Sequence, residues 1–207
     1  MFNNTLKRTL YSFSLVALLG VPALALAAAQ PGQPAPNFSE TDASGKTQSL
    51  SDYKGQWLVL EWFNKDCPFV GKHYRSGNMQ ALQKKYTDGG VKWLSVISSA
   101  KGKQGYLGAN EALQEAKSNG TKLSAAYLMD GDGSMGRAYG AKTTPHMFVI
   151  NPEGVVVYAG AIDDNSSANP AVIPESTNYV ADALDAGMNG QPIPVASSRA
   201  YGCSVKY

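Results

Sequence analysis

The chain has 207 residues, of which 43% are hydrophobic and 16% are charged, a composition typical of a folded protein with a sizeable core. Its 18 Lys and Arg residues nearly balance its 16 Asp and Glu residues, which argues against a nucleic-acid-binding surface. Two cysteines are too few for a disulfide-rich framework or a four-thiolate metal site.

The N-terminus has the layout of a secretory signal peptide. Lys7 and Arg8 precede an apolar run over residues 11–26, and small residues follow from Ala25 onward. The alternative is a retained membrane anchor, but the run is shorter than the roughly 20 apolar residues that span a bilayer. We therefore expect cleavage, a periplasmic location and no stable membrane insertion afterwards. Without Lys7 and Arg8 the net charge is about zero.

The rest of the chain is expected to form one domain. We predict a signal peptide over residues 1–27, an extended lead-in over 28–36, a domain over 37–190 and a C-terminal tail over 191–207 that carries Cys203. The tail contains prolines and shows no periodicity, so we expect it to be flexible.

Strands and helices alternate along the domain. The first half predicts a hairpin (38–41 and 46–50), a buried strand (57–63), a helix (about 67–86) and a strand (91–98). The second half predicts a helix (110–119), a short strand (126–129), a short helix ending at 138, a hairpin (147–150 and 155–159) and a helix (173–188). Asp88-Gly89-Gly90 ends the first helix, and Asn151 to Gly154 form the turn of the second hairpin.

This order indicates an α/β fold, a central mixed sheet with helices on both faces. The order β-α-β-α-β-β-α resembles the thioredoxin fold. The N-terminal hairpin extension and the inserted helix resemble the peroxiredoxin and glutathione-peroxidase branch of that superfamily.

Cys67 is the strongest candidate for a catalytic residue. It lies where the buried strand turns into the first helix, followed by Pro68, which is compatible with a first helical turn. A thiol at a helix N-terminus faces unpaired N–H groups and the positive end of the helix dipole, both of which favour the thiolate. The alternative is an inert buried cysteine that acts as a small hydrophobic residue.

Thr144-Pro145 precedes the strand at 147–150 and is the second element of the candidate site. In thioredoxin-like proteins a Thr-Pro at this place has a cis bond, lies against the reactive cysteine and exposes backbone that pairs with substrate. The resemblance implies these roles for Thr144 and Pro145. An ordinary trans proline is the alternative.

The sequence departs from the thioredoxin pattern at Val70, where a C-x-x-C motif would have its second cysteine. Cys203 is the other cysteine in the chain. The pair forms a nucleophile with its resolving thiol, a structural disulfide that fastens the tail, or two separate thiols. The motifs Cys67-Pro68-Phe69-Val70 and Gly202-Cys203-Ser204 resemble a peroxiredoxin-like subgroup of redoxin-domain proteins, the alkyl hydroperoxide reductase and thiol-specific antioxidant family.

Peroxidase activity is an alternative function. Peroxiredoxins surround the peroxidatic cysteine with Pro-x-x-x-Thr/Ser-x-x-Cys, and here Leu60 and Asn64 occupy the first two of these positions. The Asn64 amide remains a hydrogen-bond donor toward a substrate. Arg75 and Arg137 are candidates for the arginine that usually stabilises the thiolate.

Other polar residues indicate no further site. Cys67 and His73 diverge by about 240° around a helix, and with His146 they are too few for a metal site, so we expect no metal and no cofactor. Asp163 and Asp164 follow the second hairpin, and we expect them in a solvated turn.

The sequence thus predicts an exported thiol-disulfide oxidoreductase with Cys67 as nucleophile and Cys203 or an external thiol as the resolving group. Its partners would be a protein or small-molecule thiol or disulfide and an external thiol reductant. A thiol-dependent peroxidase and a non-enzymatic binding module with a structural Cys67–Cys203 disulfide are the alternatives.

Overall fold

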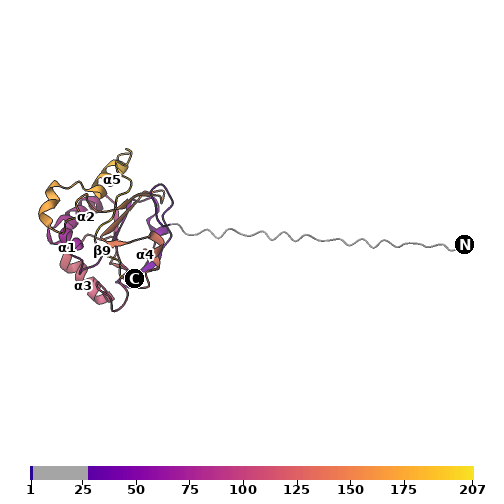
Figure 1. Ribbon diagram of the computed structural model, residues 1–207, viewed down its shortest axis with the longest axis horizontal. Helices are drawn as coiled ribbons and strands as arrows, with labels where there is room; N and C mark the ends of the chain where they lie inside the picture. The colour runs from indigo at the N-terminus through magenta and orange to yellow at the C-terminus, as the bar shows by residue number, and fades with distance from the viewer. Residues whose placement is uncertain (2–27) are drawn as a thin grey trace.

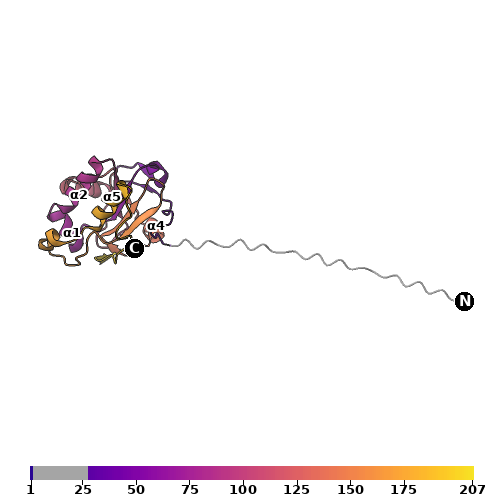
Figure 2. The same cartoon turned by 90° about the horizontal axis from the view of Figure 1, so that it is seen from above.

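The computed structural model describes Met1 and residues 28–207, so most of the expected signal peptide lies outside the described residues. Figures 1 and 2 show residues 28–207 as one body with a sheet between helices. In the described part of the chain, no helix is both long enough and apolar enough to cross a membrane.

A five-stranded mixed sheet lies at the centre of the body, in the order β5–β4–β3–β7–β8. β3 (Leu58–Trp62) is the middle strand, parallel to β4 (Lys92–Ile97) and antiparallel to β7 (His146–Ile150). β5 (Leu128–Met129) pairs in parallel with β4, and β8 (Val156–Gly160) pairs antiparallel with β7. Because both faces of the sheet are covered, every residue of β3 is buried.

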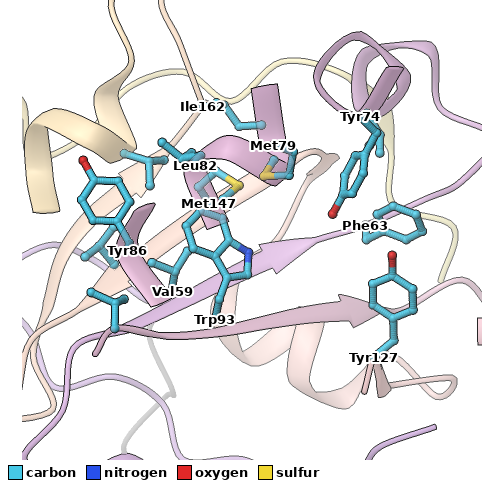
Figure 3. Close-up of a cluster of buried hydrophobic side chains, with 14 of the residues drawn as sticks. Val59, Phe63, Tyr74, Met79, Leu82, Tyr86, Trp93, Tyr127, Met147 and Ile162 are labelled. Carbon is cyan, nitrogen blue, oxygen red and sulfur yellow. The ribbon is translucent and has the colours of Figure 1, made fainter. Parts of the chain in front are cut away.

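Helices cover the two faces of this sheet. They are α1 (Pro68–Arg75), α2 (Asn78–Asp88), α3 (Ala109–Asn119), α4 (Ser134–Tyr139) and α5 (Tyr179–Met188), with the 3-10 helices η1 (Leu50–Tyr53) and η2 (Pro170–Glu175). Val59 and Phe63 point to one face, where they join a cluster that includes residues of α1, α2 and α5 (Figure 3). Leu60 and Trp62 point to the other face and belong to a second cluster with residues of α4.

The N-terminal hairpin consists of β1 (Ser39–Thr41) and β2 (Thr47–Ser49), paired antiparallel as predicted. The core order β3-α1-β4-α4-β7-β8-α5, with α3 and β5 inserted between β4 and α4, confirms the expected thioredoxin fold.

The helix predicted over about 67–86 is two helices. α1 ends before Ser76, whose hydroxyl donates to the Lys72 carbonyl at 2.8 Å, and Gly77 adopts a left-handed φ of 77° before α2 begins. The prediction of one helix was wrong because a glycine in this conformation ends a helix, although the apolar periodicity continues beyond it.

The helix predicted over 173–188 is also divided. η2 contains Pro174 and ends before Ser176, and α5 begins after Asn178. The Asn178 side chain accepts a hydrogen bond from the Ala181 N–H at 2.9 Å, which caps α5. The prediction gave the helix too early a start because it missed this N-cap.

The 191–207 tail is fixed to the domain, so the expectation of a flexible tail was wrong. Ser197 forms a parallel bridge with Ala159 in β8. Further along, β9 (Cys203–Ser204) pairs antiparallel with β6 (Thr143–Thr144), forming a separate two-stranded sheet. Main-chain hydrogen bonds of this kind produce no hydrophobic periodicity, so they could not be predicted from the residue pattern.

Candidate active site

Cys67 is the N-cap residue of α1, at the point where the chain leaves the buried strand β3. Its carbonyl accepts the N–H of Gly71 at 2.9 Å, and Pro68 occupies the first helical turn. Proline fits there because first-turn N–H groups have no helical partner. Cys67 is only 1% exposed, so the thiol lies beneath other parts of the chain.

The Thr144–Pro145 peptide bond is cis, as the resemblance implied. The Cys67 Sγ donates to the Thr144 carbonyl at 2.9 Å. The Thr144 hydroxyl is buried without a hydrogen-bond partner and lies close enough to Cys67 to favour its thiolate. The structure therefore brings Cys67, Pro68, Thr144 and Pro145 together at one place.

Cys203 belongs to the same site. It lies opposite Thr144 in the β6–β9 pair and packs against the core cluster that contains Cys67. The preceding residue, Gly202, has a φ of 139°, and a Cβ at this position would lie 2.1 Å from the Thr144 carbonyl oxygen. Only glycine allows the tail to approach the Thr144 backbone so closely. Both cysteines are free thiols.

The two thiols differ in acidity. Burial raises the pKa of Cys67, but hydrogen bonds from the Cys203 thiol and from the Val70 and Cys203 N–H groups lower it, as does the nearby Thr144 hydroxyl, and the net pKa lies below the ordinary value of 9.0. Burial and the neighbouring Cys67 sulfur raise the pKa of Cys203 to about 11. Of this pair, Cys67 therefore loses its proton first, and the thiolate is the nucleophilic form.

Asn64 has a structural position beside this site. Its side chain accepts a hydrogen bond from the Asp66 N–H at 2.9 Å and donates to the Gln104 carbonyl at 3.4 Å. Its own carbonyl accepts the Cys67 N–H at 3.1 Å. These contacts hold the turn before Cys67 against the loop at Gln104, and a substrate contact by Asn64 stays a prediction.

One of the two predicted arginines, Arg137, has contacts away from Cys67, and the role of Arg75 stays a prediction. The Arg137 guanidinium lies 4.6 Å from the centre of the Tyr207 ring and donates to the Asp132 carbonyl at 2.6 Å. The Arg75 guanidinium covers Gly71, one helical turn beyond Cys67. Arg137 thus contributes to holding the end of the tail.

A buried ion pair lies under the tail, and sequence analysis missed it. The Lys72 Nζ donates to Asp163 Oδ2 at 2.8 Å and to the Asn165 carbonyl at 2.7 Å, and the two charged side chains are 0% and 3% exposed. The expectation of a solvated turn at Asp163 was wrong because the loop after β8 folds back onto α1. Asp164 is exposed and accepts the Thr177 N–H at 3.0 Å.

Tyr201 joins the ion pair to the tail. Its hydroxyl donates to Asp163 Oδ1 and accepts a hydrogen bond from Lys72 Nζ at 3.2 Å. His73 Nε2 lies 3.4 Å from the same hydroxyl, and burial lowers the pKa of His73 to about 4, so this imidazole is neutral near pH 7. In the sequence, the one sign of this buried ion pair was the position of Lys72 on the apolar face of a helix.

His146, the other histidine, is buried, and burial lowers its pKa to about 4. Its Nδ1 accepts the Lys142 N–H at 3.3 Å, and its ring centre lies 4.6 Å from that of Phe148. Over residues 28–207, no group of three or more His, Cys, Asp and Glu side chains has the arrangement of a metal site.

Comparison with known proteins gives relatives with related chemistry. Thiol-disulfide oxidoreductase ResA of Bacillus subtilis (strain 168) is 27% identical over 133 residues, covering 61% of this chain and 64% of ResA. Thioredoxin peroxidase of Fasciola hepatica is 52% identical over 44 residues, covering 20% of this chain and 23% of that protein. These matches span less than two thirds of the length of either relative.

Solved structures show the same fold over most of the chain. The crystal structure of an uncharacterized conserved protein from Geobacillus kaustophilus superposes with a TM-score of 0.74 and 25% identity, covering 86% of this chain and 92% of that one. The sequence profile of the AhpC/TSA family matches residues 31–159, more than half of this chain, and includes Cys67, Thr144 and Pro145 but not the tail. The chain belongs to the AhpC/TSA family.

Proposed function

We propose that this protein is an exported thiol-disulfide oxidoreductase in which the Cys67 thiolate attacks a disulfide and Cys203 resolves the product. The observation that carries the proposal is that two free thiols lie together beside Thr144–Pro145, where their surroundings lower the pKa of Cys67 and raise that of Cys203. The similarity to ResA, a thiol-disulfide oxidoreductase, supports the same reaction class.

The reaction has two exchange steps. In the first, the Cys67 thiolate forms a bond to one sulfur of the substrate disulfide, the substrate S–S bond breaks, and the other substrate sulfur leaves as a thiolate. In the second, Cys203 loses its proton and attacks the Cys67 sulfur, which releases the remaining substrate thiolate. The substrate gains two electrons and two protons, and the protein is left with a Cys67–Cys203 disulfide.

An external dithiol would restore the reduced protein by the same exchange in reverse, so it is the second partner of the cycle. The substrate is a protein or small-molecule disulfide. We assign Thr144 and Pro145 to substrate contact because they lie against Cys67. We assign Pro68 and Asn64 to the same surface around the thiol, with Asn64 also holding the turn before Cys67.

Peroxide reduction is a second candidate, favoured by the 52% identity to a thioredoxin peroxidase over a short segment. The Cys67 thiolate would attack one peroxide oxygen, forming a sulfenic acid and releasing an alcohol or water. The Cys203 thiol would then condense with the sulfenic acid to give the same disulfide and one water.

We also propose that residues 1–27 are a cleaved signal peptide that takes the domain to the periplasm. The charged and apolar pattern at Lys7, Arg8 and residues 11–26 supports this. An oxidising compartment would make the electron donor for the Cys67–Cys203 pair essential to turnover.

Turnover of a disulfide-containing protein substrate with excess dithiol tests the proposal. We expect Cys67→Ser to abolish turnover, and Cys203→Ser to accumulate a mixed disulfide between Cys67 and the substrate. The same variants assayed with hydrogen peroxide distinguish a peroxidase from a thiol-disulfide oxidoreductase. A peroxidase would turn over hydrogen peroxide faster than it turns over disulfides. Turnover by Cys67→Ser at the rate of the unmodified protein would overturn both functions.

A further inference from the structure

Tyr201 is half-buried against Phe69, Lys72 and Asp163, which together form the Tyr201 pocket. Its hydroxyl bonds to both members of the buried Lys72–Asp163 pair, and the Lys72 Nζ lies 5.3 Å from the centre of its ring. The Phe69 ring, on the same helix, lies edge-on to it with ring centres 5.8 Å apart. The pocket therefore contacts both the ring and the hydroxyl of a tyrosine.

The tail also covers a backbone edge beside Cys67. β6 has β9 as its partner in a two-stranded sheet, so Thr143 and Thr144 would present free main-chain groups if the tail left. An extended peptide can add to such an edge, where main-chain hydrogen bonds supply affinity and side-chain pockets supply specificity. A cavity of about 610 Å³, lined in part by Thr143, Asp163 and Gly202, lies alongside and leaves room for chain to move.

The Tyr201 pocket and the Thr144 edge have a fixed spacing. In the tail, Tyr201 enters the pocket while Cys203, two residues later, lies opposite Thr144 and beside the Cys67 sulfur. In a chain that pairs with β6 in this register and places a cysteine at Cys67, the residue that enters the Tyr201 pocket lies two positions before that cysteine. The two contacts together define a short sequence pattern, Tyr-Gly-Cys in this chain.

We propose, on the basis of the proposed function, that these features form a peptide-binding site whose substrates are extended protein segments with a tyrosine two residues before the reactive cysteine. The Tyr201–Cys203 segment is an internal copy of such a substrate and occupies the site in the resting protein. A substrate binds when this segment leaves the Thr144 edge.

This arrangement links product release to resolution. The substrate segment and the tail pair with the same edge at Thr144, so only one of them can occupy it. When the tail returns, it displaces the substrate segment from the edge, and Cys203 then attacks the Cys67 sulfur from the side opposite the substrate sulfur. The Cys67–substrate bond breaks, and the reduced substrate leaves without a main-chain contact to hold it.

The test is binding of a labelled peptide with the sequence of residues 198–206 in which serine replaces the cysteine. It is added to the full-length unmodified protein, to Gly202→Ala and to Gly120→Ala, and fluorescence anisotropy is followed. In Gly202→Ala the new Cβ would meet the Thr144 oxygen, which displaces the tail. Gly120 also has a positive φ, of 62°, but a Cβ there meets nothing within 4 Å, so Gly120→Ala is the matched control.

We expect the peptide to bind Gly202→Ala at least about ten-fold more tightly than the other two proteins, because its site is open. Replacing the peptide tyrosine by phenylalanine should weaken binding by about ten-fold or more, since it removes the hydroxyl that hydrogen-bonds to both members of the buried Lys72–Asp163 pair. Equal binding to all three proteins, or equal binding of the two peptides, would overturn the proposal, as would the absence of binding. Since the peptide has no sulfur, these results are independent of whether Cys67 exchanges disulfides.

Discussion

Cys203 lies directly opposite Thr144, whose carbonyl accepts the hydrogen bond of the Cys67 thiol. Thr144 therefore contacts two cysteines that are 136 positions apart in the sequence, and the two thiols lie close together. The same residue supplies a buried hydroxyl without a hydrogen-bond partner. This arrangement favours the thiolate of Cys67 and disfavours the thiolate of Cys203.

Cys67 should titrate below its ordinary pKa of 9.0. Cys203→Ala removes a thiol that donates to the Cys67 sulfur, so the pKa of Cys67 should rise in this variant. Thiolate absorbance as a function of pH measures it, with Cys203→Ser as the control that keeps a donor and shifts less. An unchanged titration in Cys203→Ala would contradict the contact between the two side chains.

The lowered pKa also affects stability. A thiol whose pKa is lower in the folded than in the unfolded chain stabilises the fold above the unfolded pKa, and this contribution is lost as the pH falls through the folded pKa. The reduced protein should therefore gain stability relative to Cys67→Ser as the pH rises through that range. Denaturant unfolding of both proteins at several pH values checks the sign.

Glu61 should be the most sensitive polar residue of the core. It is fully buried in β3 and accepts hydrogen bonds from Tyr74, Trp93, Ser95 and Gln83. Glu61→Ala leaves these donors without a partner, so the free energy of unfolding should fall by about 3–5 kcal/mol. Glu61→Gln keeps one acceptor and should lose about 1–3 kcal/mol. Equal stability of the alanine variant and the unmodified protein would contradict this network.

Burial raises the pKa of Glu61 above its ordinary 4.5, with the four hydrogen bonds acting in the opposite direction. A raised folded-state pKa means that the folded chain holds the proton longer than the unfolded chain. Stability should therefore decline as the pH rises from about 4.5 through the folded pKa, and Glu61→Gln should remove this part of the pH dependence. Unfolding titrations of the two proteins at matched pH give the comparison.

Tyr201→Phe should loosen the tail without disturbing the core. The variant loses a hydroxyl bonded to Asp163 and Lys72, which should favour tail opening by about 1–3 kcal/mol. Alkylation of Cys203 in the reduced protein should accelerate by roughly ten-fold or more. Tyr179→Phe is a suitable control, because this tyrosine lines the same cavity. Equal alkylation rates in the two variants would show that the hydroxyl does not hold the tail.

Gly77→Ala should test the break between α1 and α2. A Cβ at Gly77 meets nothing within 4 Å, but its φ of 77° is unfavourable for alanine, so the expected loss of stability is about 1 kcal/mol. Thiol reactivity should stay unchanged, since Cys67 lies at the other end of α1. A stabilised variant would indicate one continuous helix.

Much of the fold was predictable because it depends on local patterns. An apolar run followed by Cys67 and Pro68 identifies a central strand and the start of a helix, and Thr144-Pro145 before a strand identifies the second part of the site. The breaks at Gly77 and before Asn178 were missed because apolar residues continue on both sides of each.

The pairing of Lys72 with Asp163 and the position of Cys203 opposite Thr144 could not be predicted from the sequence. Lys72 and Asp163 are 91 positions apart, and opposite charges at such a separation look the same whether they meet or face solvent. The β6–β9 pair has two residues in each strand, too short for alternating hydrophobicity to appear. Both depend on how the loop after β8 and the tail fold back over α1.

Mass spectrometry after acid quenching tests the central claim most directly. The reduced protein is mixed with one equivalent of a small disulfide, quenched at successive times, alkylated and digested. We predict an early mixed disulfide on Cys67 that converts to a linked Cys67–Cys203 pair, and a mixed disulfide that persists in Cys203→Ser. A first adduct on Cys203, or an adduct on Cys67 that persists in the unmodified protein, would contradict the account.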